Sequence, residues 1–481
     1  MKRFYQTLFL SLLIPLGAYA QADTTASFTL DDCIRYALEN TIDVKNARID
    51  EQISQAKVKE TTGLGLPQID GSVNITDNPK LSRIYQKYDA SSDGVFGDLS
   101  QIPGIKDGDV VAFQNFFQLR SSADAGLNIN QLLFSSTYLV GLKAASTYKQ
   151  LSFRTTEQTK ITTIEKVTKA FYAVLIDVER VGRLDNNIAR LDSTLKTTKA
   201  MNENGFTEAI DVDRLQVNLN NLKTDRLKTL NLQNLNLLLL KFQMNYPIDK
   251  PLVVKGDLNV VMNDNLFSDY EQGWDYKNRI EYKVLETQRE LQRLNVKNKQ
   301  SNGHPQLTAN AGLGYSTQSD NLGGLFKTKS DIADFGPIGP DKWYPYSRIG
   351  LTLSIPIFSG LQRTYQVQQE KLALLKIENN FASLKQNIDL SIQQNSITYR
   401  NSVESLKSQQ ENLALADKVA RITKIKYEQG VGSNIEVIDA EGSVRDAQVN
   451  YYNALYDALI AKVDLDKAFA KLDPVQYETK K

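Results

Sequence analysis

Four short segments of the chain alternate apolar and polar residues with the two-residue period of a β-strand. The clearest covers residues 347–358, where Leu351 and Leu353 alternate with Thr352 and Ser354. The other three lie near residues 67–77, 123–134 and 305–317. Each is about ten residues long, which is the length that a tilted strand needs to cross a bilayer. The pattern therefore predicts four strands, each with one apolar face and one polar face.

Two proline-free stretches, residues 136–203 and 360–428, predict helices of unusual length. A continuous helix of about 65 residues is about 100 Å long, which implies coiled-coil packing. Shorter helices are predicted to follow at residues 207–244 and 434–472. In the last of these, apolar residues recur at spacings of three and four, as at Val437, Ala440, Val444, Ala447 and Tyr451. This apolar stripe favours a helix that packs against neighbouring helices on both of its sides, as in a helical cylinder. An ordinary two-helix coiled coil is the alternative.

The same order of elements occurs twice along the chain. The segment GLNINQLLFS (residues 126–135) matches GLTLSIPIFS (residues 350–359), and GFTEAIDV (residues 205–212) matches GVGSNIEV (residues 430–437). Each copy is predicted to run helix, strand, loop, strand, very long helix, turn and helix. The matches divide the mature chain into two repeats, residues 21–250 and 251–481.

The chain begins with the pattern of an export signal. Lys2 and Arg3 precede the apolar run LFLSLLIPLGAYA, which ends in small residues typical of a cleavage site. We expect residues 1–20 to be a secretory signal peptide, with a buried N-terminal helix as the alternative. Its removal changes the formal net charge from +1 to −1, with 55 basic against 56 acidic residues. A nearly neutral chain gives no electrostatic reason to expect a nucleic-acid partner.

The residues that carry most enzyme chemistry are scarce. Cys33 is the one cysteine and His304 the one histidine of the chain. This composition excludes an internal disulfide and a conventional zinc site. The scattered serines and aspartates have no histidine partner for a catalytic triad. The glycine-rich pieces lack the spacing of a phosphate-binding loop. We therefore expect neither enzymatic activity nor a metal or other cofactor.

Four membrane strands cannot stand alone, because every strand edge in lipid must be paired. Single-chain bacterial barrels begin at eight strands, so four strands per chain require oligomerisation. Three copies would provide twelve strands, although the strand count alone does not fix the number of subunits.

The arrangement resembles the TolC-like outer-membrane efflux proteins over nearly the whole mature chain. The resemblance is carried by TLDDCIRYALENTIDVKNAR, by GLTLSIPIFSG and, most specifically, by GVGSNIEVIDAEGSVRDAQVNYYNALYDALIAKVDL. It implies a mixed α and β membrane protein, a homotrimer with a twelve-stranded β-barrel in the outer membrane of a Gram-negative-type bacterium. A long α-helical coiled-coil barrel would continue across the periplasm. The implied function is a passive exit duct for efflux or secretion, with a periplasmic adaptor and an inner-membrane pump as partners.

Two turns interrupt the helices and are expected to be the tips of helical hairpins. They comprise Gly205, Phe206 and Thr207 in copy one and Gly430, Val431, Gly432 and Ser433 in copy two. The resemblance implies that these tips contact the adaptor.

Three carboxylates follow the turns: Asp211, Glu436 and Asp439. The resemblance implies that acids at these positions narrow the periplasmic entrance. In a trimer each acid would occur three times and form a ring of negative charge that favours the passage of cations. Alternatively, they are ordinary solvated acids in the first turn of a helix, stabilised by the helix dipole.

Two other functions stay open on the sequence. The lack of a histidine-centred site argues against a barrel enzyme such as a lipid hydrolase. A periplasmic coiled-coil scaffold or adaptor that never enters the membrane is disfavoured by the alternating strands. Trp343, Tyr344 and Tyr346, beside the fourth strand, also suit a membrane interface. Drugs, metals, dyes and polypeptides all remain candidate substrates.

Overall fold

The computed structural model describes residues 26–91, 102–115, 117–258, 270, 274–327 and 343–477. The expected signal peptide, residues 1–20, lies outside these ranges. The chain divides into two compact units: unit 1 is Met1–Ile49, Phe153–Val284 and Phe381–Lys481, and unit 2 is Asp50–Ser152 and Leu285–Asn380. Each unit takes segments from both sequence repeats, so the compact units cut across the repeats.

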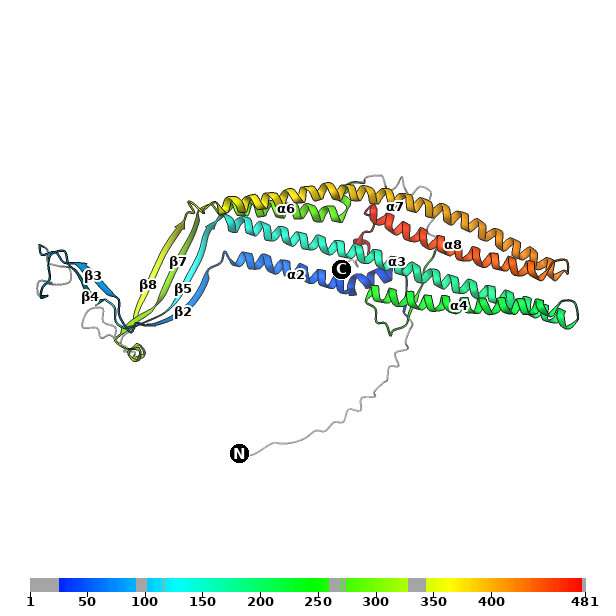
Figure 1. Cartoon of the computed structure of the whole chain (residues 1–481), viewed down its shortest axis with the longest axis horizontal. Coiled ribbons are helices and arrows are strands. Elements are labelled where there is room, and N and C mark those ends of the chain that lie inside the picture. The colour runs from blue at the N-terminus through cyan, green and yellow to red at the C-terminus, as the bar shows by residue number, and fades with distance from the viewer. Residues whose placement is uncertain are drawn as a thin grey trace, which may run out of the picture. The chain divides into compact units, whose positions relative to one another are not determined.

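The two repeats contain the same series of elements (Figure 1). Copy one contains α1 (Leu30–Asn40), α2 (Ile42–Gly63), β2 (Gln68–Asp77), β5 (Ser121–Ser135), α3 (Ser136–Glu203) and α4 (Ala209–Met244). Copy two contains α6 (Ile280–Ser301), β7 (Gln306–Ser319), β8 (Tyr344–Ser354), α7 (Gln362–Glu428) and α8 (Asn434–Ala468). β8 and α8 each end four residues before the bounds expected from the sequence.

Shorter elements accompany this series. They are β1 (Ala26–Phe28), β3 (Arg83–Lys87), β4 (Val110–Gln114), β6 (Leu252–Val254), η2 (Tyr276–Asn278), η3 (Leu322–Phe326) and η4 (Pro474–Tyr477). β1 and β6 pair in parallel, whereas β3 and β4 form an antiparallel pair. The β3–β4 pair lies between β2 and β5, in a segment that we expected to be a loop.

Local signals explain where several helices begin. Thr29 caps α1: its Oγ1 accepts a hydrogen bond from the Asp32 amide, and the Asp32 carboxylate accepts one from the Thr29 amide. In copy one β5 runs directly into α3. In copy two residues 355–361 separate β8 from α7, and Gly360 and Leu361 have φ angles of 60° and 66° in the left-handed region. Glycine adopts that conformation readily, and a leucine is strained there.

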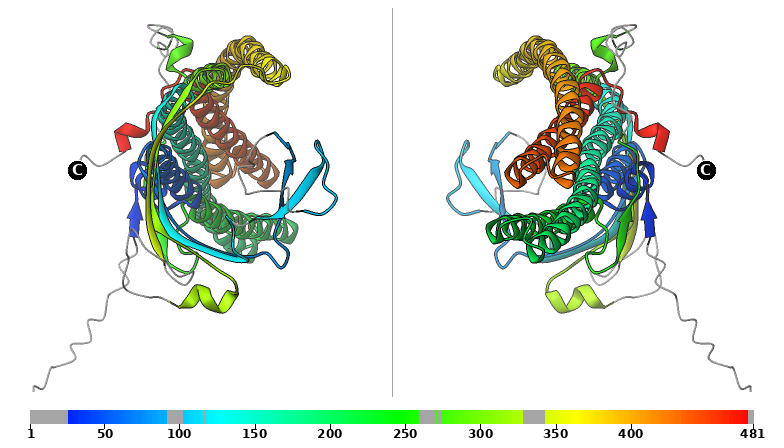
Figure 2. Two further views of the ribbon diagram at one scale, coloured as in Figure 1. Left: turned by 90° about the vertical axis from the view of Figure 1, so that its left-hand side faces the viewer. Right: turned by 90° about the vertical axis from the view of Figure 1, so that its right-hand side faces the viewer.

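The main sheet of unit 2 is curved and antiparallel, with the strand order β2-β5-β7-β8 (Figures 1 and 2). Cross-strand partners share a face, so the register can be read as rows. One row consists of Ile69, Ile129, Ala311 and Ile349, and the next consists of Asp70, Asn128, Gly312 and Arg348. The sheet therefore has an apolar face and a polar face, as the alternation predicted.

The apolar face is open along much of its length. Ile69 is 63% exposed, Val73 70% and Ile349 87%. Leu325 of η3 is buried, and η3 contacts β5 and β7. Within this sheet β2 and β8 have one neighbouring strand each, which leaves two free edges. An exposed apolar face with free edges is unstable in water, so a further surface must cover it.

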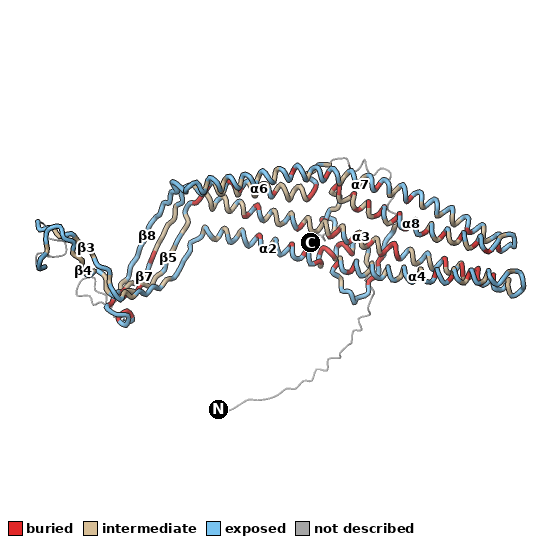
Figure 3. The backbone as a smooth tube through the Cα atoms, in the orientation of Figure 1, coloured by how far each residue is buried: buried red, intermediate tan, exposed pale blue. Residues whose placement is uncertain are grey.

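Unit 1 holds the helical core. Residues of α3 and α4, among them Phe171, Leu240 and Met244, pack against α1. Cys33 of α1 lies in this core, and its burial raises the pKa of the thiol to about 12. On α8 the expected stripe is buried at Val437, Ala440 and Val444. Figure 3 shows that buried positions concentrate on the helices, whereas β2 and β8 are mostly exposed. Within the described ranges, no helix is both long and apolar enough to cross a membrane.

Candidate functional site

The two helical hairpins end in turns of the same geometry. Gly205 and Gly430 occupy the left-handed region, with φ angles of 73° and 69°. The amide after each glycine donates to a carbonyl five residues back, Phe206 to Met201 (2.8 Å) and Val431 to Lys426 (3.0 Å). These bonds, with the glycine in this conformation, define a Schellman helix end. Both turns lie between long helices, as expected for hairpin tips.

Side-chain hydrogen bonds organise the turns. The Asn202 amide donates to the Thr207 carbonyl at 2.7 Å in copy one. Ser433 caps α8 in copy two, because its hydroxyl accepts from the Glu436 amide at 3.3 Å. Asn434 Nδ2 also donates to the carbonyl of Asp211 at 2.9 Å, and its side chain is buried. This last bond joins the two hairpins next to their tips.

The tips present apolar side chains to the surface. Phe206 is 79% exposed and Val431 78%, at equivalent positions of the two copies. Beside them, α4 and α8 line a groove of about 470 Å³. Its apolar residues are Ile210, Val217, Ile435 and Ile438, and its polar residues are Asp213, Arg214 and Asn218. Exposed apolar side chains beside such a groove are typical of a protein-binding surface.

The three expected acids differ in their surroundings. Asp211 is half-buried, accepts a hydrogen bond from the Thr207 hydroxyl at 3.4 Å and lies 3.8 Å from Arg214. Glu436 and Asp439 are exposed on α8, three residues apart and therefore on adjacent turns of one helix face. Neither of these two has an ion-pair partner within the described ranges. The structure thus separates Asp211, which has a hydrogen-bond donor and a weak ion-pair partner, from two exposed acids without an ion-pair partner in the described ranges.

The polar face of the sheet carries charged groups that we did not single out from the sequence. Asp70, Asp124 and Arg348 all lie on it. Asn74 donates to Asp124 at 2.9 Å, and Asn310 donates to Thr352 at the same distance. The alternation could have identified these residues, because each stands one position from an apolar residue of the opposite face.

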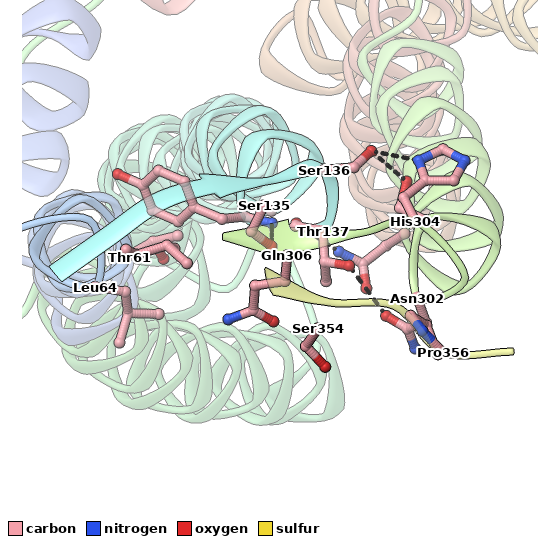
Figure 4. Close-up of a pocket in the computed structure, with 15 residues that line it drawn as sticks. Thr61, Leu64, Ser135, Ser136, Thr137, Asn302, His304, Gln306, Ser354 and Pro356 are labelled. Atoms are coloured by element: carbon pink, nitrogen blue, oxygen red, sulfur yellow. Dashed lines mark hydrogen bonds between the residues drawn. The ribbon is translucent and has the colours of Figure 1, made fainter. Parts of the chain in front are cut away.

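A polar cavity of about 500 Å³ lies where the sheet of unit 2 meets its helices (Figure 4). The Ser136 hydroxyl contacts both His304 Nδ1 at 2.9 Å and the Ser301 hydroxyl at 3.2 Å. Thr137 donates to Asn302 at 3.2 Å. These bonds join the strand-to-helix step of copy one to the helix-to-strand step of copy two. His304 closes a turn, since its amide donates to the Ser301 carbonyl.

No group of three or more metal-binding side chains occurs in the part of the chain that the structure describes.

Residues 277–471 match the family model of outer membrane efflux proteins. The outer membrane protein TolC of Vibrio cholerae is 19% identical over 348 residues, which cover 72% of this chain and 76% of that protein.

Two solved structures show the same fold. The Campylobacter jejuni CmeC outer membrane channel aligns with a TM-score of 0.68 at 16% identity, over 92% of this chain and 86% of that one. The open state of the Neisseria gonorrhoeae MtrE outer membrane channel aligns with a TM-score of 0.66 at 17% identity, over 92% and 88%. These likenesses establish the fold.

Proposed function

We propose, from the premise that the chain is a TolC-like outer membrane efflux protein, that it forms the exit duct of a tripartite efflux system. The protein lies in the outer membrane, and its helical part extends into the periplasm. The observation that carries the proposal is the four-stranded sheet, which has one exposed apolar face, one polar face and two free edges. Such a sheet suits a wall between lipid and water.

The free edges support a trimer. If β8 of one copy pairs with β2 of the next, every backbone group at the edges is satisfied, as lipid requires. Three copies then close a twelve-stranded barrel, with Ile69 and Ile349 facing lipid and Asp70 and Arg348 facing the lumen. A passive duct needs no catalytic group or cofactor of its own, and transport would be driven by an inner-membrane pump.

The function is tested by membrane fractionation and planar-bilayer recording. The mature protein is expected in the outer-membrane fraction, and the purified trimer is expected to conduct ions in a lipid bilayer. Recovery of the protein in the soluble fraction without detergent would favour the periplasmic scaffold instead. Hydrolysis of phospholipid by the purified trimer would favour the barrel enzyme.

Glu436 and Asp439 are proposed to form rings of charge at the periplasmic entrance. Replacing both by alanine is expected to lower the cation-to-anion permeability ratio roughly two- to fivefold. The reason is that an exposed charge attracts a passing cation about as strongly as it attracts the partner of an exposed ion pair, by about 0.2–1 kcal/mol. Single-channel reversal potentials in a salt gradient measure this ratio. Asp457→Ala removes an exposed acid about five turns further along α8 and is the control. We expect a smaller effect from Asp211→Ala, because Asp211 is half-buried and Arg214, 3.8 Å away, offsets part of its charge. An unchanged ratio in the double variant would remove both residues from the entrance.

The tip residues, with the groove between α4 and α8, are proposed to bind a periplasmic adaptor. This set comprises Gly205, Phe206, Thr207, Gly430, Val431, Gly432 and Ser433. Phe206→Ser with Val431→Ser is expected to weaken binding about tenfold or more, because apolar anchors dominate such interfaces. Surface plasmon resonance with a purified periplasmic adaptor protein measures the affinity. Val475→Ser, at a position that is also 70% exposed, is the matched control. Equal affinities for the two variants would place the adaptor elsewhere.

A further inference from the structure

Three arginines line one small cavity in unit 1, away from the hairpin tips. Arg180 and Arg183 come from α3, and Arg445 comes from α8. The cavity has a volume of about 130 Å³. Its other lining residues are Leu184, Thr229, Gln448, Val449, Tyr452 and Asn453. Like charges gathered around one cavity repel each other, so the arrangement has a cost unless something else offsets it.

The charge of Arg180 is only partly satisfied. Its Nη2 donates to the Asn453 side chain, and its Nη1 lies 3.8 Å from the Asp177 carboxylate. That carboxylate also accepts a hydrogen bond from Asn236 at 2.6 Å, and its burial raises its pKa, which opposes the charged form. The Nε of Arg180 is buried and lacks a hydrogen-bond acceptor among the described residues. An unpaired buried donor is costly, and because this atom is closed off from solvent, a bound group reaches it only if the Arg180 side chain shifts.

The other two guanidinium groups have spare donors as well. The Tyr452 hydroxyl, which accepts a hydrogen bond from Arg183 Nε at 3.2 Å, raises the pKa of Arg183, and the charges of Glu179 and Asp417 raise it further. Neither of these two carboxylates lies within ion-pair distance of Arg183. Arg445 contacts its sequence neighbour Asp446 at 3.3 Å, but the Asp446 side chain is 70% exposed. Surface pairs of this kind neutralise charge weakly. The cavity therefore keeps unused arginine N–H groups on both of its walls, and its positive charge is only partly offset by Asp177, Asp446 and the more distant Glu179 and Asp417.

We propose that this cavity binds phosphate, either as the free ion or as the phosphate group of a larger molecule. The planar fork of arginine matches the geometry of phosphate oxygens, and arginine is favoured where such oxygens are bound by paired hydrogen bonds. The volume suits a small group, since sites for drug-sized molecules measure about 300–1,000 Å³. Leu184 and Val449 give the cavity an apolar margin that a substituent on the phosphate can contact.

The bound phosphate would join α3 to α8. Between these helices Asn187 already donates to Gln448 at 2.6 Å, and Arg190 pairs with Glu441 at 3.2 Å. The cavity lies next to these contacts along both helices. Bound phosphate would therefore add one more contact between the two helical hairpins, at a position along α3 and α8 away from the tips.

Isothermal titration of the purified full-length trimer in detergent, at low ionic strength, tests the proposal. The probes are inorganic phosphate and phenyl phosphate, titrated separately. Inorganic phosphate is expected to bind, and Arg183→Gln is expected to weaken that binding about tenfold or more, through loss of a charge-assisted contact. Arg183→Lys keeps the positive charge but loses the planar guanidinium group, and it is expected to weaken phosphate binding by a smaller factor. Tighter binding of phenyl phosphate assigns the cavity to the phosphate group of a larger molecule, and weaker binding assigns it to the free ion.

Arg226→Gln is the matched control. Arg226 lies on α4, carries the same charge and is held by Asp185 outside the cavity. Binding of phosphate should be nearly unchanged in this variant. Arg445→Gln provides a second test from the opposite wall, and circular dichroism checks that each variant is folded. The proposal is overturned if neither probe binds, or if Arg183→Gln and Arg226→Gln reduce the affinity equally.

Discussion

Replacing Gly314 by alanine is expected to prevent most of the protein from assembling in the outer membrane. A Cβ atom at position 314 would lie 2.5 Å from the carbonyl oxygen of Ala125 and 2.8 Å from the Cα of Gly126. It would also lie 2.8 Å from the Tyr346 hydroxyl, which extends over this part of the polar face. Tyr346 can rotate away, but the two backbone atoms belong to the paired strand β5 and can move only if the pairing opens.

The expected cost is that of an overpacked site, about 1–3 kcal/mol per chain. A closed trimer contains the substitution three times, so the cost per assembly is about 3–9 kcal/mol. Cross-linking of intact cells, followed by quantification of trimer in the outer-membrane fraction, measures the effect. Gly312→Ala is the matched control, because it lies on the same face of the same strand and its added Cβ would meet only side-chain atoms, at 3.5–3.8 Å. Equal trimer yields from the two variants would show that β5 and β7 do not approach each other as described.

Ile349→Arg is expected to block insertion, because Ile349 lies on the apolar face and is 87% exposed. Its row contains Ile69, Ile129 and Ala311, so the new charge would face lipid with no polar neighbour in the row. An arginine on the lipid face near the midplane of a barrel costs about 2–4 kcal/mol, and a trimer incurs this cost three times. The outer-membrane fraction is expected to lose most of the protein, and the periplasm to accumulate it.

Thr352→Arg places the same residue on the polar face of the same strand and is the control. Arg348 already occupies that face, next to Ile349 in sequence, so the face tolerates the group. We expect Thr352→Arg to insert normally and to change only the ion conductance of the pore. Normal insertion of Ile349→Arg, or failure of both variants, would contradict the assignment of the apolar face to lipid.

The sequence predicted those features that depend on neighbouring residues. Alternation along β8 separates Leu351 from Thr352 because successive strand side chains point to opposite faces. A glycine between two helical patterns, as at Gly205 and Gly430, marks a helix end because it enters the left-handed region without strain. The buried stripe of α8 follows from a helical period of about 3.6 residues. The chain's own repeat strengthened each prediction.

Long-range pairing produced the features that the sequence did not reveal. The β3–β4 hairpin was expected to be a loop, because its two short strands are separated by a long connection. Gly314 has no visible constraint in the sequence, yet its cross-strand partners are Gly126 and Tyr346. Likewise Arg183 and Arg445 are ordinary helical residues until α3 and α8 pack together.

The sequence by itself therefore determined the four strands of the main sheet, their two faces, the long helices and the turns between them, since each depends on a local pattern. Only the tertiary structure decided which strands are neighbours, which glycines have backbone atoms close by and which charges share a cavity. The physical reason is that strand register and helix packing are set by contacts between segments far apart in the chain. Residues such as Arg180 and Arg445 become neighbours only after those contacts form.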